Sequence, residues 1–148
     1  WRSSTSRGER SPRKAILRGV QNRLAVKVYY EDTDSLGVVY YANYLKYFER
    51  GRSELIADLG KTVGEWNREG FNFVVFKMNI TFHKPGRLSD RCEVLTEIVP
   101  GSDVKLKMRQ RLFRGEELLT EADAVIVCLD NDFELRELPE QLVMWDDP

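Results

Sequence analysis

The sequence has few of the residues that bind metals or form disulfides. Its 148 residues include one histidine, His83, and two cysteines, Cys92 and Cys128. No CxxC pair and no metal-ligand spacing occurs, so we predict that there is no metal site. The cysteines fall in separate strand-like runs, which favours two small buried side chains over a disulfide. Unpaired cysteines are typical of a reducing compartment, so we expect a cytoplasmic protein.

Long apolar runs and phosphate-binding glycine motifs are also missing. The longest apolar runs, such as residues 125–129, have the length of a strand, whereas a membrane-spanning helix needs about 20 apolar residues. The sequence contains no phosphate loop, no dinucleotide fingerprint and no GxSxG turn that would present a nucleophilic serine. These absences argue against a membrane span, a nucleotide-binding fold and a serine hydrolase that uses His83 as its base.

The formal net charge of −1 is unevenly distributed. Residues 1–23 carry a net charge of +6 and residues 130–148 carry −6, while the core between them is balanced. We therefore expect no nucleic-acid partner. Residues 1–22 are rich in Arg and Ser and predict a flexible basic extension, with an organellar transit peptide as the alternative. We place one folded domain at 23–140 and an acidic C-terminal tail at 141–148.

Hydrophobic periodicity predicts an α+β chain with one long helix. The expected elements are a strand at 24–29, helices at 42–59 and 62–70, and strands at 71–83, 90–99, 103–114 and 117–130. Glycine turns between the last strands are short, which requires antiparallel pairing. The last strand is apolar on both faces from Ala122 to Cys128 and should be central. One helix is then available to cover a curved five-stranded sheet.

Local signals refine the two helices. Gly51 lies in the middle of the long helix, where glycine costs about 1 kcal/mol relative to alanine. We therefore expect the helix to pack closely against the sheet at this residue. Gly60 stands where a helix C-terminal cap belongs. Thr62 and Glu65 have the spacing of a capping box and predict the start of the short helix.

The strand expected at 71–83 has more apolar side chains than one helix can cover. In its second half, apolar and polar residues alternate, which predicts one half-buried face formed by Phe76, Met78, Ile80 and Phe82. In its first half, apolar side chains occupy both faces: Phe71, Phe73, Val74 and Val75. We therefore expect a homo-oligomer, at least a dimer, that buries this strand.

Three acids, Glu31, Asp32 and Asp34, lie in the loop between the first strand and the long helix. A carboxylate there can act as nucleophile or general base, and the first amides of the helix lack intrahelical partners and can receive an oxyanion. This combination suits acyl transfer. Alternatively, the acids serve only as solvated turn formers. A calcium loop is disfavoured, because Leu36 stands where that loop needs an oxygen ligand and Asn43 stands where it needs a bidentate glutamate.

A long motif runs from these acids into the helix: YYEDTD at 29–34, GVVYYANY at 37–44 and FERGRSE at 48–54. It resembles the 4-hydroxybenzoyl-CoA thioesterase family, and within it the acyl-CoA thioesterases associated with the bacterial Tol-Pal system. The resemblance covers about residues 23–140. It implies a hotdog fold, in which a curved five-stranded antiparallel sheet wraps around one long helix. It also implies assembly into homo-dimers or tetramers.

The resemblance also implies roles for individual residues. The catalytic carboxylate of the family maps onto Asp34, as nucleophile or general base. The backbone N–H that polarises the thioester carbonyl maps onto Tyr41, where many relatives have histidine. The candidates for binding the CoA phosphates are Lys77, Lys84 and Arg87. The candidates for lining the pantetheine tunnel are Val39 and Tyr40. No cofactor is expected beyond the CoA that the substrate carries.

Three functions remain open at the level of sequence. The leading one is an acyl-CoA thioesterase that releases a free acid and CoA. The second is a non-catalytic module that binds acyl-CoA or an acyl carrier protein, against which the intact Asp34 argues. The third is a dehydratase of the same fold, which would pair a histidine with an acid, whereas His83 lies on another segment.

Overall fold

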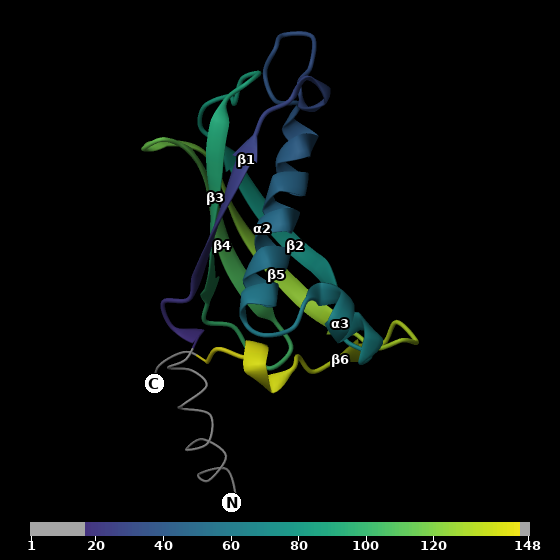
Figure 1. Ribbon diagram of the computed structural model, residues 1–148. Coiled ribbons are helices and arrows are strands. Elements are labelled where there is room, and N and C mark those ends of the chain that lie inside the picture. Colours follow the sequence, from purple (N-terminus) through teal and green to yellow (C-terminus); the bar gives the residue numbers. More distant parts are fainter. Residues whose placement is uncertain (1–16, 146–148) are drawn as a thin grey trace, which may run out of the picture.

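The computed structural model describes residues 17–145, so residues 1–16 and 146–148 lie outside the description. Within this range one antiparallel sheet is formed in the order β1-β3-β4-β5-β2, with β6 paired to β5 (Figure 1). The strands are β1 (Gln21–Lys27), β2 (Asn72–Phe82), β3 (Arg91–Val99), β4 (Leu106–Arg114), β5 (Glu117–Leu129) and β6 (Leu135–Arg136). The expected five strands are therefore joined by a sixth. β6 is only two residues long, too short for an alternating pattern to reveal it.

The long helix α2 (Tyr44–Asp58) lies against one face of this sheet (Figure 1). The α+β class and the hotdog arrangement implied by the resemblance are thus confirmed. The short helix α3 (Val63–Arg68) begins with the predicted capping box. Glu65 N donates to Thr62 Oγ1 at 3.1 Å, and Thr62 N donates to Glu65 Oε1 at 2.9 Å. No helix of the described range is long and apolar enough to cross a membrane.

The core lies between α2 and the inner face of the sheet. In β4 the inner face is formed by alternate residues, all of them buried: Leu106, Met108, Gln110 and Leu112. β5 has strands on both sides, as its apolar faces predicted, because β4 and β2 both pair with it. Its inner residues Ala122, Ala124 and Ile126 are buried beneath the helix layer.

The folded part extends beyond both expected boundaries of the domain. β1 begins at Gln21, and Leu17 is buried in the core with 1% of its surface exposed. Residues 142–144 belong to the expected acidic tail at 141–148, but their apolar side chains pack into the same core, so this expectation is wrong for them. Gly101 N also donates to Met144 O at 2.8 Å. The acids around this segment made it look like a solvated tail, whereas its apolar side chains decide its position.

β2 forms one edge of the sheet and contains a bulge. Its pairing with β5 shifts register between Val75 and Lys77, which leaves Phe76 without a paired position. Phe76 is 64% exposed, so its expected place on the half-buried face was wrong, whereas Met78 and Ile80 do pack against the core. The exposed edge strand therefore carries three apolar side chains in a row, since Val74 and Val75 are exposed as well.

Gly51 marks the closest approach of α2 to the sheet. A Cβ atom at this position would lie 2.7 Å from Thr96 Oγ1 and 2.8 Å from Val94 Cγ1. Both neighbours belong to β3 and are fully buried. The glycine is therefore required by the packing of helix on strand, as the sequence predicted.

We expect Gly51→Ala to destabilise the protein. Overpacking a core costs about 1–3 kcal/mol, and two contacts below 3.0 Å put Gly51 at the upper end. Alanine returns about 1 kcal/mol of helix propensity, so the net loss in the free energy of unfolding should be about 2 kcal/mol. Urea unfolding at one fixed chain concentration measures it. Gly64→Ala in α3 is the matched control, because the nearest atom to its Cβ would be 3.9 Å away. Equal losses in the two variants would contradict the packing argument.

Candidate active site

The loop between β1 and α2 is folded by its own backbone. Asp34 N donates to Val38 O at 2.9 Å and Gly37 N donates to Asp34 O at 3.0 Å, which closes a tight turn. Gly37 has a φ of +76°, a conformation that glycine adopts without steric cost. A β-bridge between Thr33 and Val39 closes the base of the turn. The turn therefore holds Asp34 in a defined position.

The Asp34 carboxylate is half-buried, and only one of its oxygens is engaged. Leu36 N donates to Asp34 Oδ1 at 2.9 Å. Among residues 17–145, the other oxygen makes no hydrogen bond or ion pair. One amide thus orients the carboxylate while the second oxygen stays available. Such a group can attack a carbonyl carbon or accept a proton from water.

Asp32 is used by the loop itself. Its Oδ2 accepts a hydrogen bond from Tyr29 N at 2.9 Å, at the start of a 3-10 turn. Its carbonyl oxygen accepts from Tyr40 N at 2.9 Å and from Asn43 Nδ2 at 2.8 Å. These bonds tie the loop to the start of the helix. The two aspartates of the motif therefore have different roles, and Asp32 is structural.

Tyr47 lies close to Asp32 from the side of α2. Its ring is buried, and its hydroxyl has no hydrogen-bond partner among the described residues. Burial raises the pKa of Tyr47, and the nearby Asp32 carboxylate raises it further, so the hydroxyl stays protonated. Sequence analysis did not identify Asn43 as a support of the loop or Tyr47 as a neighbour of Asp32. An aromatic residue on the inner face of a helix is typical of core packing, so no signal marked Tyr47.

The chain enters α2 through a 3-10 turn, Tyr41–Asn43. Asn43 N donates to Tyr40 O at 2.8 Å, but the Tyr41 N–H has no partner within the part of the chain that the structure describes. The positive end of the helix dipole lies at the same place. An unpaired amide at a helix start can stabilise the oxyanion that forms from an attacked thioester.

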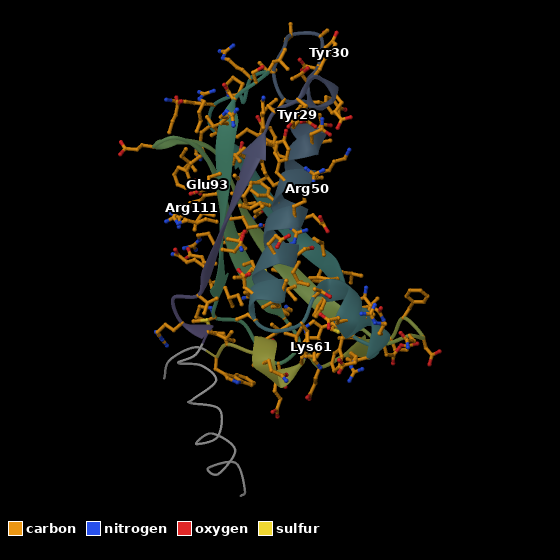
Figure 2. All side chains as sticks on the ribbon, viewed as in Figure 1. Tyr29, Tyr30, Arg50, Lys61, Glu93 and Arg111 are labelled. Carbon is orange, nitrogen blue, oxygen red and sulfur yellow. The ribbon has the colours of Figure 1, made fainter. Side chains whose placement is uncertain are left out.

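The segment after β2 is hydrogen-bonded to both the loop and the helix start. Val39 N donates to Gly86 O at 2.8 Å, and Gly86 N donates to the Tyr44 hydroxyl at 3.0 Å. Leu88 N donates to Gly37 O at 3.1 Å. These three bonds join the loop, the start of α2 and the end of β2 into one unit. Figure 2 shows Tyr29 and Tyr30 at this end of the sheet, beside the start of the helix.

An open pocket lies beside this unit. Its volume is about 260 Å³, and its walls include Val39, Tyr41, Phe82 and Lys84. The Tyr41 ring lies 5.0 Å from the Tyr40 ring and 6.3 Å from the Phe82 ring, measured between centroids. Val39 contributes to the wall from the core, with 5% of its surface exposed, whereas Tyr40 is 47% exposed. Aromatic side chains thus form much of the pocket wall beside the start of the helix.

Two of the three expected phosphate-binding cations lie near the loop. The backbone of Arg87 forms a β-bridge with Val38, and its guanidinium makes no ion pair with a described residue. Lys84 lines the pocket, but its Nζ pairs with Glu117 Oε2 at 2.8 Å. Lys84, and with it Arg114, lowers the pKa of Glu117 to about 2, so the Lys84 charge is already compensated.

Lys77 does not join these two cations. It lies in a separate groove with Lys107 and Asp123, on the face of the sheet opposite α2. The bulge at Phe76 contributes to this result because it resets which residues of β2 face outward. Within one chain, the structure therefore separates Lys77 from Tyr41 and the Asp34 loop.

His83 has a carboxylate partner, but this partner is not an acid of the loop. Its Nε2 lies 2.9 Å from Glu121 Oε2, and both side chains are exposed by about two fifths. A dehydratase would pair the histidine with its catalytic acid. His83 is instead engaged across the sheet by a residue of β5, which leaves the dehydratase hypothesis without its catalytic pair.

Several known proteins that resemble this chain in sequence or in fold are named thioesterases or thioester hydrolases. The model of the thioesterase superfamily matches residues 36–121, more than half of the chain. The acyl-CoA thioester hydrolase YbgC of Escherichia coli O6:H1 is 39% identical over 123 residues, which cover 82% of this chain and 92% of that protein. The acyl-CoA thioesterase YbgC of Haemophilus influenzae is 38% identical over 106 residues, which cover 71% and 78%.

A solved structure agrees with the sequence relatives. The crystal structure of a probable thioesterase from Bartonella henselae superposes with a TM-score of 0.77 at 33% identity, over 80% of this chain and 99% of that one. The sequence pattern, the fold and the geometry around Asp34 are thus all consistent with a thioesterase. The chain belongs to the thioesterase superfamily and is a thioester hydrolase of the hotdog fold.

Proposed function

We propose that the protein hydrolyses an acyl-CoA or aroyl-CoA thioester, with Asp34 as the catalytic carboxylate and the Tyr41 amide as the oxyanion donor. One observation supports this above all. Asp34 is held by Leu36 N through one oxygen, while its other oxygen is unengaged, a few residues before an unpaired amide at a helix start. The names of the relatives in E. coli and H. influenzae support CoA as the carrier.

Two routes use these groups, and atoms balance in both. On the nucleophilic route, an Asp34 oxygen attacks the carbonyl carbon, the C–S bond breaks, and the CoA thiolate leaves and takes a proton from solvent. Water then hydrolyses the mixed anhydride. On the general-base route, Asp34 takes a proton from water, the hydroxide attacks, and the proton passes to the departing thiolate. A single turnover in oxygen-18 water would label Asp34 only on the nucleophilic route.

We further propose that two copies pair along their β2 edges. An unprotected edge strand presents unpaired N–H and C=O groups, and here it also exposes Val74, Val75 and Phe76. Two-fold pairing of identical edges would cover the backbone groups and the apolar side chains together. Each active site would then lie at the interface between two chains.

Several narrower expectations stay predictions. They are the association with the Tol-Pal system, the cytoplasmic location, a tetramer rather than a dimer, an acyl carrier protein as partner, and the absence of a cofactor beyond CoA. The alternative of a non-catalytic acyl-CoA binding module is decided by the first experiment below.

Asp34→Asn should lower kcat at least ~10²-fold, because the amide keeps the hydrogen bond from Leu36 but is neither a nucleophile nor a base. Binding of a CoA ester should persist. Release of free thiol from an acyl-CoA panel measures kcat, and calorimetry measures binding. Glu31→Gln is the matched control, since it removes one negative charge from an exposed position of the same loop. If Asp34→Asn keeps more than about a tenth of wild-type kcat, the assignment is wrong.

Tyr41→Pro tests the amide itself. Proline removes the N–H and suits the first position of a helical turn, where that N–H has no partner. Tyr41→Ala loses the same ring but keeps the N–H, so it is the reference. Relative to Tyr41→Ala, kcat of Tyr41→Pro should fall about 10²- to 10³-fold, as when an oxyanion donor is removed. Equal kcat values would show that another donor serves the oxyanion.

Val75→Lys should prevent pairing of the β2 edges. A lysine on an edge strand blocks strand addition, because its charge would be buried in the interface. Sedimentation should give at least twice 17.3 kDa for the wild type and 17.3 kDa for the variant, and activity should be lost with the dimer. Phe133→Lys is the control, since Phe133 is 80% exposed and lies outside the named strands, between β5 and β6. A fully active monomer would refute the shared site.

A further inference from the structure

A second, smaller pocket lies between α2, α3 and β2. Its volume is about 90 Å³, and most of its walls are apolar: Ile56, Val63, Phe73, Met108 and Ile126. Val74 and Val75 of the β2 edge form its rim. An apolar cavity of roughly 150 Å³ holds benzene, so this one has room for only a short chain of a few carbons.

Two charged residues of α2, Glu49 and Arg52, also line this pocket. Of the two, Arg52 is the more deeply buried. Its Nη1 donates to Gln110 Oε1 at 3.0 Å. Gln110 is fully buried, and its Nε2 donates to Phe48 O at 2.7 Å and to Thr96 Oγ1 at 3.0 Å. The Arg52 guanidinium is therefore positioned by its hydrogen bond to Gln110, whose own side chain is fixed by burial and by two further hydrogen bonds.

The Arg52 charge has no counter-ion in the described chain. No carboxylate of residues 17–145 lies within ion-pair distance of the guanidinium, and its hydrogen bond within this range is the one to Gln110. Burial lowers the pKa of Arg52, and the neighbouring Glu49 acts in the opposite direction. Glu49 is exposed and accepts a hydrogen bond from Ser53, so water screens its charge. A half-buried guanidinium without a partner carboxylate is suited to receive one.

Pairing of the β2 edges would bring this pocket to the Asp34 site of the partner. Antiparallel partners run in opposite directions, so the start of one β2 faces the end of the other. Residues 73–75 border the Arg52 pocket, whereas Phe82 and Lys84 border the Tyr41 pocket. In a two-fold dimer centred near Met78, the two pockets therefore meet across the interface.

We propose, on the basis of the dimeric hydrolase proposed above, that the Arg52 pocket receives the far end of the acyl group and selects short acyl chains that end in a carboxylate. The thioester carbonyl lies at Asp34 and Tyr41 of one chain. The acyl chain crosses the interface along Val74 and Val75 and ends at Arg52 of the other. Arg52 is thus a specificity-determining residue, and the substrate class is a short dicarboxylic acid monothioester of CoA.

The test compares glutaryl-CoA with pentanoyl-CoA, whose acyl groups both have five carbons and differ only at the far end. Wild-type kcat/KM, corrected for hydrolysis without enzyme, should be about 10- to 100-fold higher for glutaryl-CoA, as expected for one hydrogen bond to a charged group. In Arg52→Met this ratio should collapse to about one or below. Arg52→Lys should restore part of it, because the positive charge returns without the planar fork.

Arg50→Gln is the matched control for loss of a positive charge from α2. Arg50 lies on the helix in Figure 2 and lines a different groove, towards β1, so the ratio should stay at its wild-type value. Hydrolysis of pentanoyl-CoA without a preference for glutaryl-CoA would overturn the inference and leave the proposed hydrolase intact. A proportional loss on both substrates in Arg52→Met would also overturn it and assign Arg52 to structure. Hydrolysis of neither substrate by the wild type would overturn both proposals.

Discussion

The contact between α2 and the sheet at Gly51 is the constraint on which the rest of the structure depends. With no side chain at this position, the helix backbone lies so close to β3 that an added Cβ would be 2.7 Å from Thr96 Oγ1. At the same level Gln110 donates to Phe48 O, a carbonyl of the helix itself. A buried glutamine in an apolar core is stabilised only when its polar atoms are paired, and here Thr96, Phe48 and Arg52 pair them.

The position of the helix determines what its first turn can do. Because α2 is fixed on the sheet, its start meets the end of β2, where Gly86 bonds to both Val39 and Tyr44. The acidic loop lies between these elements, and its internal hydrogen bonds give its two aspartates different roles. Asp32 is engaged by the loop through its carboxylate and its carbonyl. Asp34 keeps one oxygen unengaged, and this difference makes it the chemically available acid.

The same packing explains why a single chain leaves the β2 edge and its adjoining pockets uncovered. α2 packs mainly against β1 and β3, on the side of the sheet away from β2, and the β2 edge retains exposed apolar side chains at Val74, Val75 and Phe76. The pocket beside Tyr41 is open, and the pocket beside Arg52 reaches the same edge from the other end of the strand. A two-fold partner would cover both pockets, so the proposed chemistry depends on the proposed dimer.

The sequence by itself determined the α+β class, the long helix, the capping box at Thr62 and the close packing at Gly51, because each rests on local periodicity or on the conformational preference of one residue. It also singled out the loop of Asp34, through a long motif. Only the tertiary structure decided that Gln110 lies beneath the helix, that a bulge turns Phe76 outward, that residues 142–144 close the core, and that Lys84 is paired while Lys77 faces away. These features depend on which residues distant in the chain become neighbours, and periodicity within one segment carries no information about that.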